Sequence, residues 1–146
     1  MSETTSIAWT DSTFNPWIGC TKVSDGCTNC YAERDFSQRR KVVAWGPGQP
    51  RKRTSSENWR LPLRWERQHE AFEREHGRRR RVFCASLADV FDNEVPDEWR
   101  RDLFSLIERT PHLDWQLLTK RIGNAKDMMF LARGGHLPLL PNVWIG

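Results

Sequence analysis

Three closely spaced cysteines are the residues of this sequence whose type and spacing point most clearly to chemistry. Cys20, Cys27 and Cys30 form a C-x6-C-x2-C pattern in one short segment, and Gly19 and Gly26 precede the first two of them. A glycine lets the backbone turn close to an inorganic centre, while neighbouring amides can donate to thiolates. We therefore expect the three thiolates to face one point and to bind metal.

The number of thiolates favours an iron–sulfur cluster over a single metal ion. Three thiolates can hold three irons of a 4Fe-4S cluster and leave the fourth iron open to a substrate or cofactor. A structural zinc ion takes four protein ligands, and the second C-x2-C pair of a zinc ribbon is missing. Zinc remains an alternative if Cys84 or a histidine supplies the fourth ligand. Cys84 is otherwise expected to be a small buried side chain, and the histidines are assigned to the surface or to packing.

Composition sets the general class of the protein. The chain has 146 residues, of which 29% are charged, and a formal net charge of +4, which suits one soluble domain. It contains no run of about 18 apolar residues that would span a bilayer, and its polar N-terminus lacks the apolar stretch of a signal peptide. We expect a cytoplasmic protein without membrane contact, in which the cysteines stay reduced.

Basic residues are concentrated in three runs, namely Arg39–Lys41, Arg51–Arg53 and Arg78–Arg81. Such runs can contact phosphates, so a nucleic acid or nucleotide is a candidate partner. A solvated, flexible connection is the other interpretation, because charge runs alone have little specificity.

Hydrophobic patterning predicts alternating strands and helices around this cysteine segment. A strand over Thr13–Ile18 leads to Cys20, and a helix follows Cys30, with Cys27 or Thr28 in its first turn. Residues 42–63 are interpreted as a long loop. The remaining predicted elements are a helix over Arg64–His76, a strand over Val82–Leu87, a helix opening at Pro96 and Asp97, a strand over His112–Thr119, a helix over Asn124–Leu131 and a strand beginning at Val143–Ile145.

This order is typical of βαβ units and therefore of an α/β fold with a parallel sheet. A complete eight-unit barrel needs about 250 residues, so we expect a partial (β/α) barrel, truncated after its fourth strand, that a partner chain could complete. Residues 1–146 are expected to form this single partial domain, with a long basic loop and helix insertion at about residues 42–81.

Residues that directly follow the strands are the next candidates, because ligands of parallel α/β folds bind beyond the carboxyl ends of the strands. Ser86, Asp89 and Asp92 follow one strand, and Thr119, Lys120 and Arg121 follow the next. Thr119, Lys120 and Arg121 could bind a carboxylate or phosphate, with Arg121 forming a bidentate contact. Alternatively, Asp89 and Asp92 cap the turn or helix that follows them. The alternative for Thr119, Lys120 and Arg121 is charge pairing at the start of a helix, or solvation.

Several blocks of this sequence together resemble a phage-associated, radical-SAM-like family of poorly defined function. The blocks, in order, are Ile7–Asp11 (IAWTD), Thr13–Ser24 (TFNPWIGCTKVS), Gly26-Cys27, Cys30–Glu33 (CYAE), Val82–Phe91 (VFCASLADVF), Val95–Trp99 (VPDEW), Leu117–Arg121 (LLTKR) and Pro141–Gly146 (PNVWIG). The resemblance spans nearly the whole chain, and family members continue past its end.

The resemblance implies a radical-SAM type of partial barrel, a 4Fe-4S cluster on the three cysteines and S-adenosylmethionine on the open iron. Asp89 would then bind the amino group or ribose of that cofactor. The C-x6-C-x2-C spacing departs from the commoner C-x3-C-x2-C pattern of radical-SAM enzymes. The expected function is reductive cleavage of S-adenosylmethionine to act on an unknown substrate, by an enzyme or a fragment of one. The alternative is a non-catalytic module, stapled by zinc or a cluster, that binds nucleic acid or protein.

Overall fold

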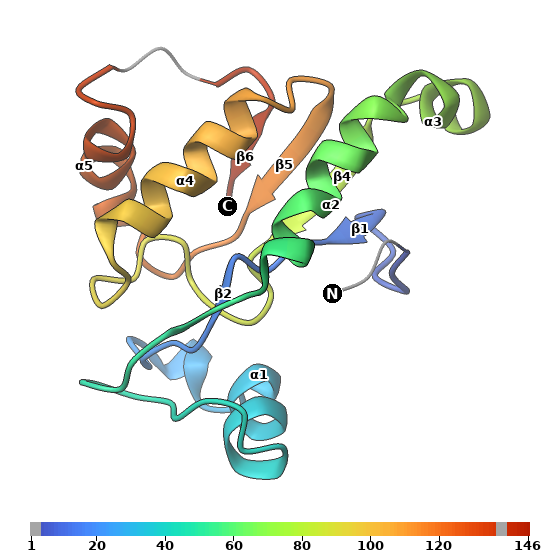
Figure 1. Ribbon diagram of the computed structural model, residues 1–146. Helices are drawn as coiled ribbons and strands as arrows, with labels where there is room; N and C mark the ends of the chain where they lie inside the picture. The colour runs from blue at the N-terminus through green and yellow to red at the C-terminus, as the bar shows by residue number, and fades with distance from the viewer. Residues whose placement is uncertain (1–3, 137–139) are drawn as a thin grey trace.

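The computed structural model describes residues 4–136 and 140–146 and is built around a parallel sheet (Figure 1). Its strand order is β1-β4-β5-β6, with β1 at Ser12–Thr13, β4 at Arg80–Cys84, β5 at Leu113–Leu117 and β6 at Val143–Ile145. All three pairings are parallel. The predicted α/β class with a parallel sheet is therefore confirmed.

The two faces of the sheet differ in character. Val82 pairs with Trp115 and Cys84 with Leu117, and these side chains are buried on one face. On the other face the in-register neighbours are Phe83, Gln116 and Trp144, of which Trp144 is 67% exposed. Alternate residues of a strand point to opposite faces, so the apolar face is the one that the helices must cover.

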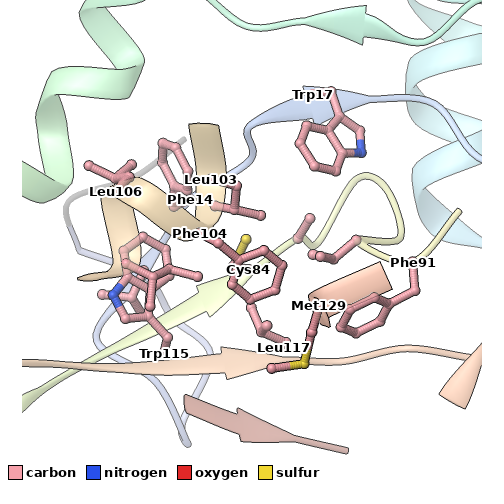
Figure 2. Close-up of a cluster of buried hydrophobic side chains, with 14 of the residues drawn as sticks. Phe14, Trp17, Cys84, Phe91, Leu103, Phe104, Leu106, Trp115, Leu117 and Met129 are labelled. Atoms are coloured by element: carbon pink, nitrogen blue, oxygen red, sulfur yellow. The ribbon is translucent and has the colours of Figure 1, made fainter. Parts of the chain in front are cut away.

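Helices α2 (Ser56–Arg67), α4 (Asp97–Glu108) and α5 (Ile122–Ala132) contribute to one core on that face. Figure 2 shows Leu103, Leu106 and Phe104 of α4 gathered around Cys84 and Trp115 of the sheet. Burial of such large apolar side chains is worth about 1.5–3 kcal/mol each, which makes this layer the main source of stability. Within the described residues, no helix combines the length and apolar character needed to cross a bilayer.

The first predicted strand is wrong as a single element. Residues 13–18 divide between β1 and a second short strand, β2 (Trp17–Ile18), which pairs antiparallel with β3 (Lys52–Arg53) in a separate two-stranded sheet. Asn15 and Pro16 lie at the break. The chain changes sheets here because Asn15 turns its side chain toward the segment after β4, with its Oδ1 2.7 Å from the Leu87 nitrogen.

The predicted loop over residues 42–63 and the helix over 64–76 also need correction. Helix α2 begins at Ser56 and ends at Arg67, and α3 spans His69–His76. The oxygen of Ser55 accepts from the Asn58 nitrogen at 3.3 Å and caps α2. Pro62 lies inside α2, where its missing N–H normally disfavours a helix, but it and Trp65 are buried. Tertiary packing therefore outweighs the local helix-breaking signal.

The remaining boundaries follow the predictions closely. Helix α4 begins at Asp97, directly after Pro96, and β6 covers the predicted residues 143–145. Strand β4 begins two residues earlier than predicted and ends at Cys84 rather than Leu87. Helix α5 and strand β5 lie within two residues of the expected bounds at each end. Beyond the end of β4, the Leu87 nitrogen donates to the side-chain Oδ1 of Asn15 at 2.7 Å rather than to the backbone of a neighbouring strand.

Candidate functional site

A cavity of about 820 Å³ lies at the carboxyl end of the sheet. In Figure 1 the arrowhead of β5 points toward the end of the sheet where α1 lies, and α3 lies at the opposite end. The cavity is lined by the three cysteines, by the aromatic residues Trp9, Tyr31, Trp45 and Phe83, and by the residues that follow β4 and β5, including Ser86, Asp89, Leu118, Thr119, Lys120 and Arg121. Every predicted site residue except Asp92 thus borders one cavity.

Residues 19–30, here called the cysteine loop, are fixed at their start by Gly19. This residue has φ of +114°, a conformation that other residues rarely adopt. Its nitrogen donates to the Leu87 oxygen at 3.1 Å, and the Gly46 nitrogen donates to the Cys20 oxygen at 3.0 Å. Contacts from two distant segments therefore set the position of Cys20.

The other two cysteines occupy the two ends of a short connection. Cys27 ends a 3-10 turn over Asp25–Cys27, and Cys30 is the N-cap of α1 (Tyr31–Glu33), which continues as a π-helix over Arg34–Arg39. The helix after Cys30 is confirmed, but the prediction that Cys27 or Thr28 lies in its first turn is wrong. The tight hydrogen bonds of the 3-10 turn, such as Cys27 N to Ser24 O at 2.9 Å, end this turn before the helix begins.

Arg121 and Lys120 each lower the pKa of one thiol of this loop, but the net shifts of the two thiols differ. Burial raises the pKa of Cys20, although Arg121 opposes this by donating from Nη1 to the sulfur at 3.4 Å. Burial also acts to raise the pKa of Cys27, but backbone amides, Ser24 and the charge of Lys120 outweigh it, so this pKa lies below its usual value. The positive charges favour thiolate, the form that binds metal.

Asp89 lines the cavity, but its carboxylate is already used by protein donors. Its oxygens accept from the Phe91 nitrogen at 3.0 Å, the Thr119 hydroxyl at 2.8 Å, the Lys120 nitrogen at 3.1 Å and Arg121 at 3.2 Å. A carboxylate offers about four acceptor positions. Asp89 therefore caps its own turn and attaches the segment after β5 to the segment after β4.

Ser86 is held in the cavity wall by two side chains that come from earlier in the sequence. Asn15 donates from Nδ2 to the Ser86 hydroxyl at 2.9 Å, and the Tyr31 hydroxyl donates to the Ser86 carbonyl oxygen at 2.8 Å. Tyr31 directly follows Cys30, so this contact ties the last cysteine to the end of β4.

Arg51 is a functional residue that the sequence did not single out from the arginine runs. Its side chain is fully buried and contacts Asp92 and Glu94 at 2.7 Å. It also donates to the Thr21 hydroxyl at 2.7 Å and to the Gly46 and Gln49 carbonyls. One guanidinium thus joins the cysteine loop to the insertion and to the turn after β4. No local signal distinguishes such an arginine from its exposed neighbours.

Arg53 and arginines of the Arg78–Arg81 run are also engaged in contacts within the protein. Arg78 binds Asp11 through two nitrogens at 2.6 and 2.7 Å. Arg80 lies over the ring of Phe72 with 4.3 Å between its guanidinium carbon and the ring centroid. Arg53 lies in the same way over Trp59 at 4.3 Å and contacts Asp102 at 2.7 Å. These contacts hold the insertion together and attach it to Asp11, which precedes β1, and to Asp102 of α4.

The three sulfurs of the cysteine loop are not arranged as in a closed zinc site. A tetrahedral zinc holds thiolates about 2.3 Å from the ion and hence about 3.8 Å apart. Among the described residues, the sulfurs of the three cysteines are not all within 4.8 Å of one another. Cys84 is buried in the core and does not line the cavity, so it is not placed to be a fourth ligand.

Comparison with known proteins adds a family but no activity. A family model described as "Protein of unknown function (DUF5131)" matches residues 4–146. No curated protein and no solved structure matches the chain.

Proposed function

The chain belongs to the DUF5131 family of proteins of unknown function, and we propose that it is a radical-SAM-like iron–sulfur protein. In this proposal Cys20, Cys27 and Cys30 bind a 4Fe-4S cluster, and S-adenosylmethionine occupies the cavity beside it. The parallel sheet is then part of a (β/α) barrel of radical-SAM type. The protein works in a reducing compartment such as the cytoplasm, where the thiols stay available.

One observation carries the proposal. Three cysteines from a single loop line one cavity at the carboxyl ends of parallel strands, which is where parallel α/β folds bind their ligands. The side chain of Cys84, the fourth cysteine of the chain, lies on the opposite, helix-covered side. The thiols at the cavity are thus distinguished from the structural thiol by position as well as by spacing.

The cavity has the size and lining of a cofactor site. A volume of about 820 Å³ lies within the range of about 300–1,000 Å³ that is usual for small-molecule sites. Trp9, Trp45 and Phe83 form apolar and aromatic walls, which are usual for such sites. A bound cluster supplies one electron for reductive cleavage of S-adenosylmethionine, which starts radical chemistry on a substrate.

The residues after β5 have separate roles in this proposal. Lys120 is exposed at the cavity, with its Cε 3.4 Å from where a β-carbon on Gly26 would lie, so its ammonium group can meet the carboxylate of the cofactor. Arg121, which contacts the Cys20 sulfur at 3.4 Å, would offset part of the negative charge of a bound cluster. Thr119 and Asp89 are positioning residues, since they hydrogen-bond to each other. Ser86 lies in the cavity wall, where its hydroxyl is hydrogen-bonded to Asn15.

The substrate is proposed as a nucleic acid or nucleotide only through Arg39–Lys41, the basic run that directly precedes the insertion. These residues are exposed, whereas most later arginines pair within the protein. Salt-dependent binding of an oligonucleotide that is lost on replacing Arg39, Arg40 and Lys41 by serine would support this. Equal binding by the variant and the parent protein would remove it.

The cluster is tested by anaerobic purification followed by iron, sulfide and zinc analysis. We expect about four irons per chain in the parent protein and in Cys84→Ala, and a loss of most iron in Cys20→Ser, Cys27→Ser and Cys30→Ser. Cys84→Ala is the matched control because it removes a thiol outside the cavity. Equal iron loss in all four variants, or one zinc and no iron in the parent protein, would contradict the proposal.

The cofactor is tested on the same preparation by electron paramagnetic resonance of the reduced protein. Addition of S-adenosylmethionine should change the signal, because it binds the open iron directly. Lys120→Gln should weaken this response without lowering the iron content. A cluster whose signal is indifferent to S-adenosylmethionine would leave an iron–sulfur protein but would exclude the radical-SAM reading.

A further inference from the structure

A second group of metal-ligating side chains lies at the opposite end of the sheet from the cysteines. Glu66 is in the last turn of α2, His69 is the first residue of α3, and His112 directly precedes β5. Figure 1 shows the junction of α2 and α3 close to the start of β5. No local sequence pattern indicates this group, because 46 residues separate Glu66 from His112.

The three side chains are close enough to share one ion. Each offers a donor atom, and the three atoms lie within 4.8 Å of one another. The rings of His69 and His112 are stacked, with 3.9 Å between their centroids and 12° between their planes. Within residues 4–136 and 140–146, it is the one group of three or more potential metal-ligating side chains whose donor atoms all lie within 4.8 Å of one another.

The hydrogen bonds around the rings indicate which atoms could bind the ion. The Nδ1 of His69 lies 2.8 Å from the Glu66 carbonyl oxygen, and a carbonyl only accepts, so this nitrogen carries the proton and Nε2 keeps its lone pair. Metal-bound histidines usually have this arrangement, in which the second ring nitrogen donates to a backbone carbonyl. The Nδ1 of His112 lies 2.5 Å from the Glu66 carboxylate, so an ion held by these two atoms would replace the proton that they share.

From this geometry we propose that Glu66, His69 and His112 bind a divalent transition-metal ion of the zinc class. Two imidazoles and a carboxylate are the ligands that such ions accept, with water completing the coordination. The bound ion connects the α2–α3 junction to the start of β5. Its role is structural, because the amino-terminal end of parallel strands contributes to stability rather than to catalysis.

The test uses tag-free protein and Co²⁺ as the probe, because cobalt reports its ligands by absorption. Cobalt on thiolates gives an intense charge-transfer band in the near ultraviolet, while cobalt on imidazole and carboxylate gives only weaker visible bands. The protein variant Cys27→Ser disables the cysteine loop as a competing site. In this background we expect one Co²⁺ per chain without the thiolate band, and a higher thermal midpoint when cobalt is added.

Matched histidine variants decide the assignment. His69→Ala and His112→Ala in the same background should each weaken cobalt binding by about tenfold or more and abolish the thermal shift. His136→Ala removes an exposed histidine elsewhere and should change neither. Equal cobalt binding by all three histidine variants, or no binding in the Cys27→Ser protein, would overturn the proposal. Neither result depends on whether the cysteine loop holds a cluster.

Discussion

Replacing Arg51 by methionine should destabilise the protein more than any exposed arginine replacement. Methionine keeps much of the length and apolar stem of arginine but removes the charge and all its donors. Asp92, only 2% exposed in its side chain, then loses the cation that lies 2.7 Å away. The Gly46, Gln49 and Thr21 oxygens lose their donor as well.

The size of the loss follows from what remains around Asp92. Removing one partner of a buried ion pair costs about 3–5 kcal/mol. The second cation, Arg121, remains 3.8 Å from Asp92 and leaves it partly paired, so we expect the lower end of the range, about 3 kcal/mol. With a urea m-value of about 1–3 kcal/mol/M, the unfolding midpoint should fall by about 1–3 M.

The assay is urea unfolding of the metal-free protein, followed by tryptophan fluorescence, with Arg34→Met as the control. Arg34 is 72% exposed in its side chain and lies 3.7 Å from Asp35, so its loss should cost less than about 1 kcal/mol. Iron retained after reconstitution is the second measurement, and it should fall in Arg51→Met because Thr21 is released. A loss in Arg51→Met that matches Arg34→Met would refute the reasoning.

Three further predictions concern pH, thiol exposure and the start of the cysteine loop. Burial acts to raise the pKa of Asp11, but hydrogen bonds from its arginine partner and a backbone amide lower it below the usual value. The stability that the Asp11 carboxylate contributes is thus present above its unfolded pKa of about 3.9 and is lost as the pH falls through the lower folded pKa. Asp11→Asn should therefore reduce stability at neutral pH and flatten the acid side of a plot of unfolding free energy against pH. The same plot for the variant and the parent protein would contradict this. Iodoacetamide should label the three cysteines of the loop in the native metal-free protein but Cys84 only after unfolding, because burial raises the pKa of that thiol; mass spectrometry that finds Cys84 labelled first would refute it. Gly19→Ala should lower stability and iron content more than Gly77→Ala, because a β-carbon on Gly19 would lie 3.1 Å from the Arg51 side chain whereas Gly77 has open space; equal thermal midpoints would contradict the comparison.

The sequence predicted the parts of the fold that depend on local pattern. The apolar run around Val82 predicts a strand, and the spacing of the apolar residues of α4 predicts an amphipathic helix. Both signals lie within the element itself and do not require knowledge of its neighbours. The division of residues 13–18 between two sheets could not be predicted in this way. It depends on hydrogen bonds from Asn15 to a segment 71 or 72 residues later, which no local pattern contains.

The same distinction holds for the candidate site. Cysteine spacing identified the thiols, and strand ends identified the residues after β4 and β5, since both signals lie within a few residues. The roles of Arg51, Glu66 and His112 depend on contacts such as Arg51–Asp92 and Glu66–His112, which join residues 41 and 46 positions apart. For Asp89, the sequence left cofactor binding and capping open, and its hydrogen bonds favour capping.

The attachments of the cysteine loop mean that this loop is not a portable motif. A short synthetic peptide with the same C-x6-C-x2-C spacing would lack the groups that shape it, namely the Leu87 carbonyl, the Gly46 nitrogen, Arg51 and Arg121. Grafting the loop onto another scaffold should therefore require transplanting its supporting segments too. Designers who want its thiol geometry would have to copy a surface assembled from four stretches of chain.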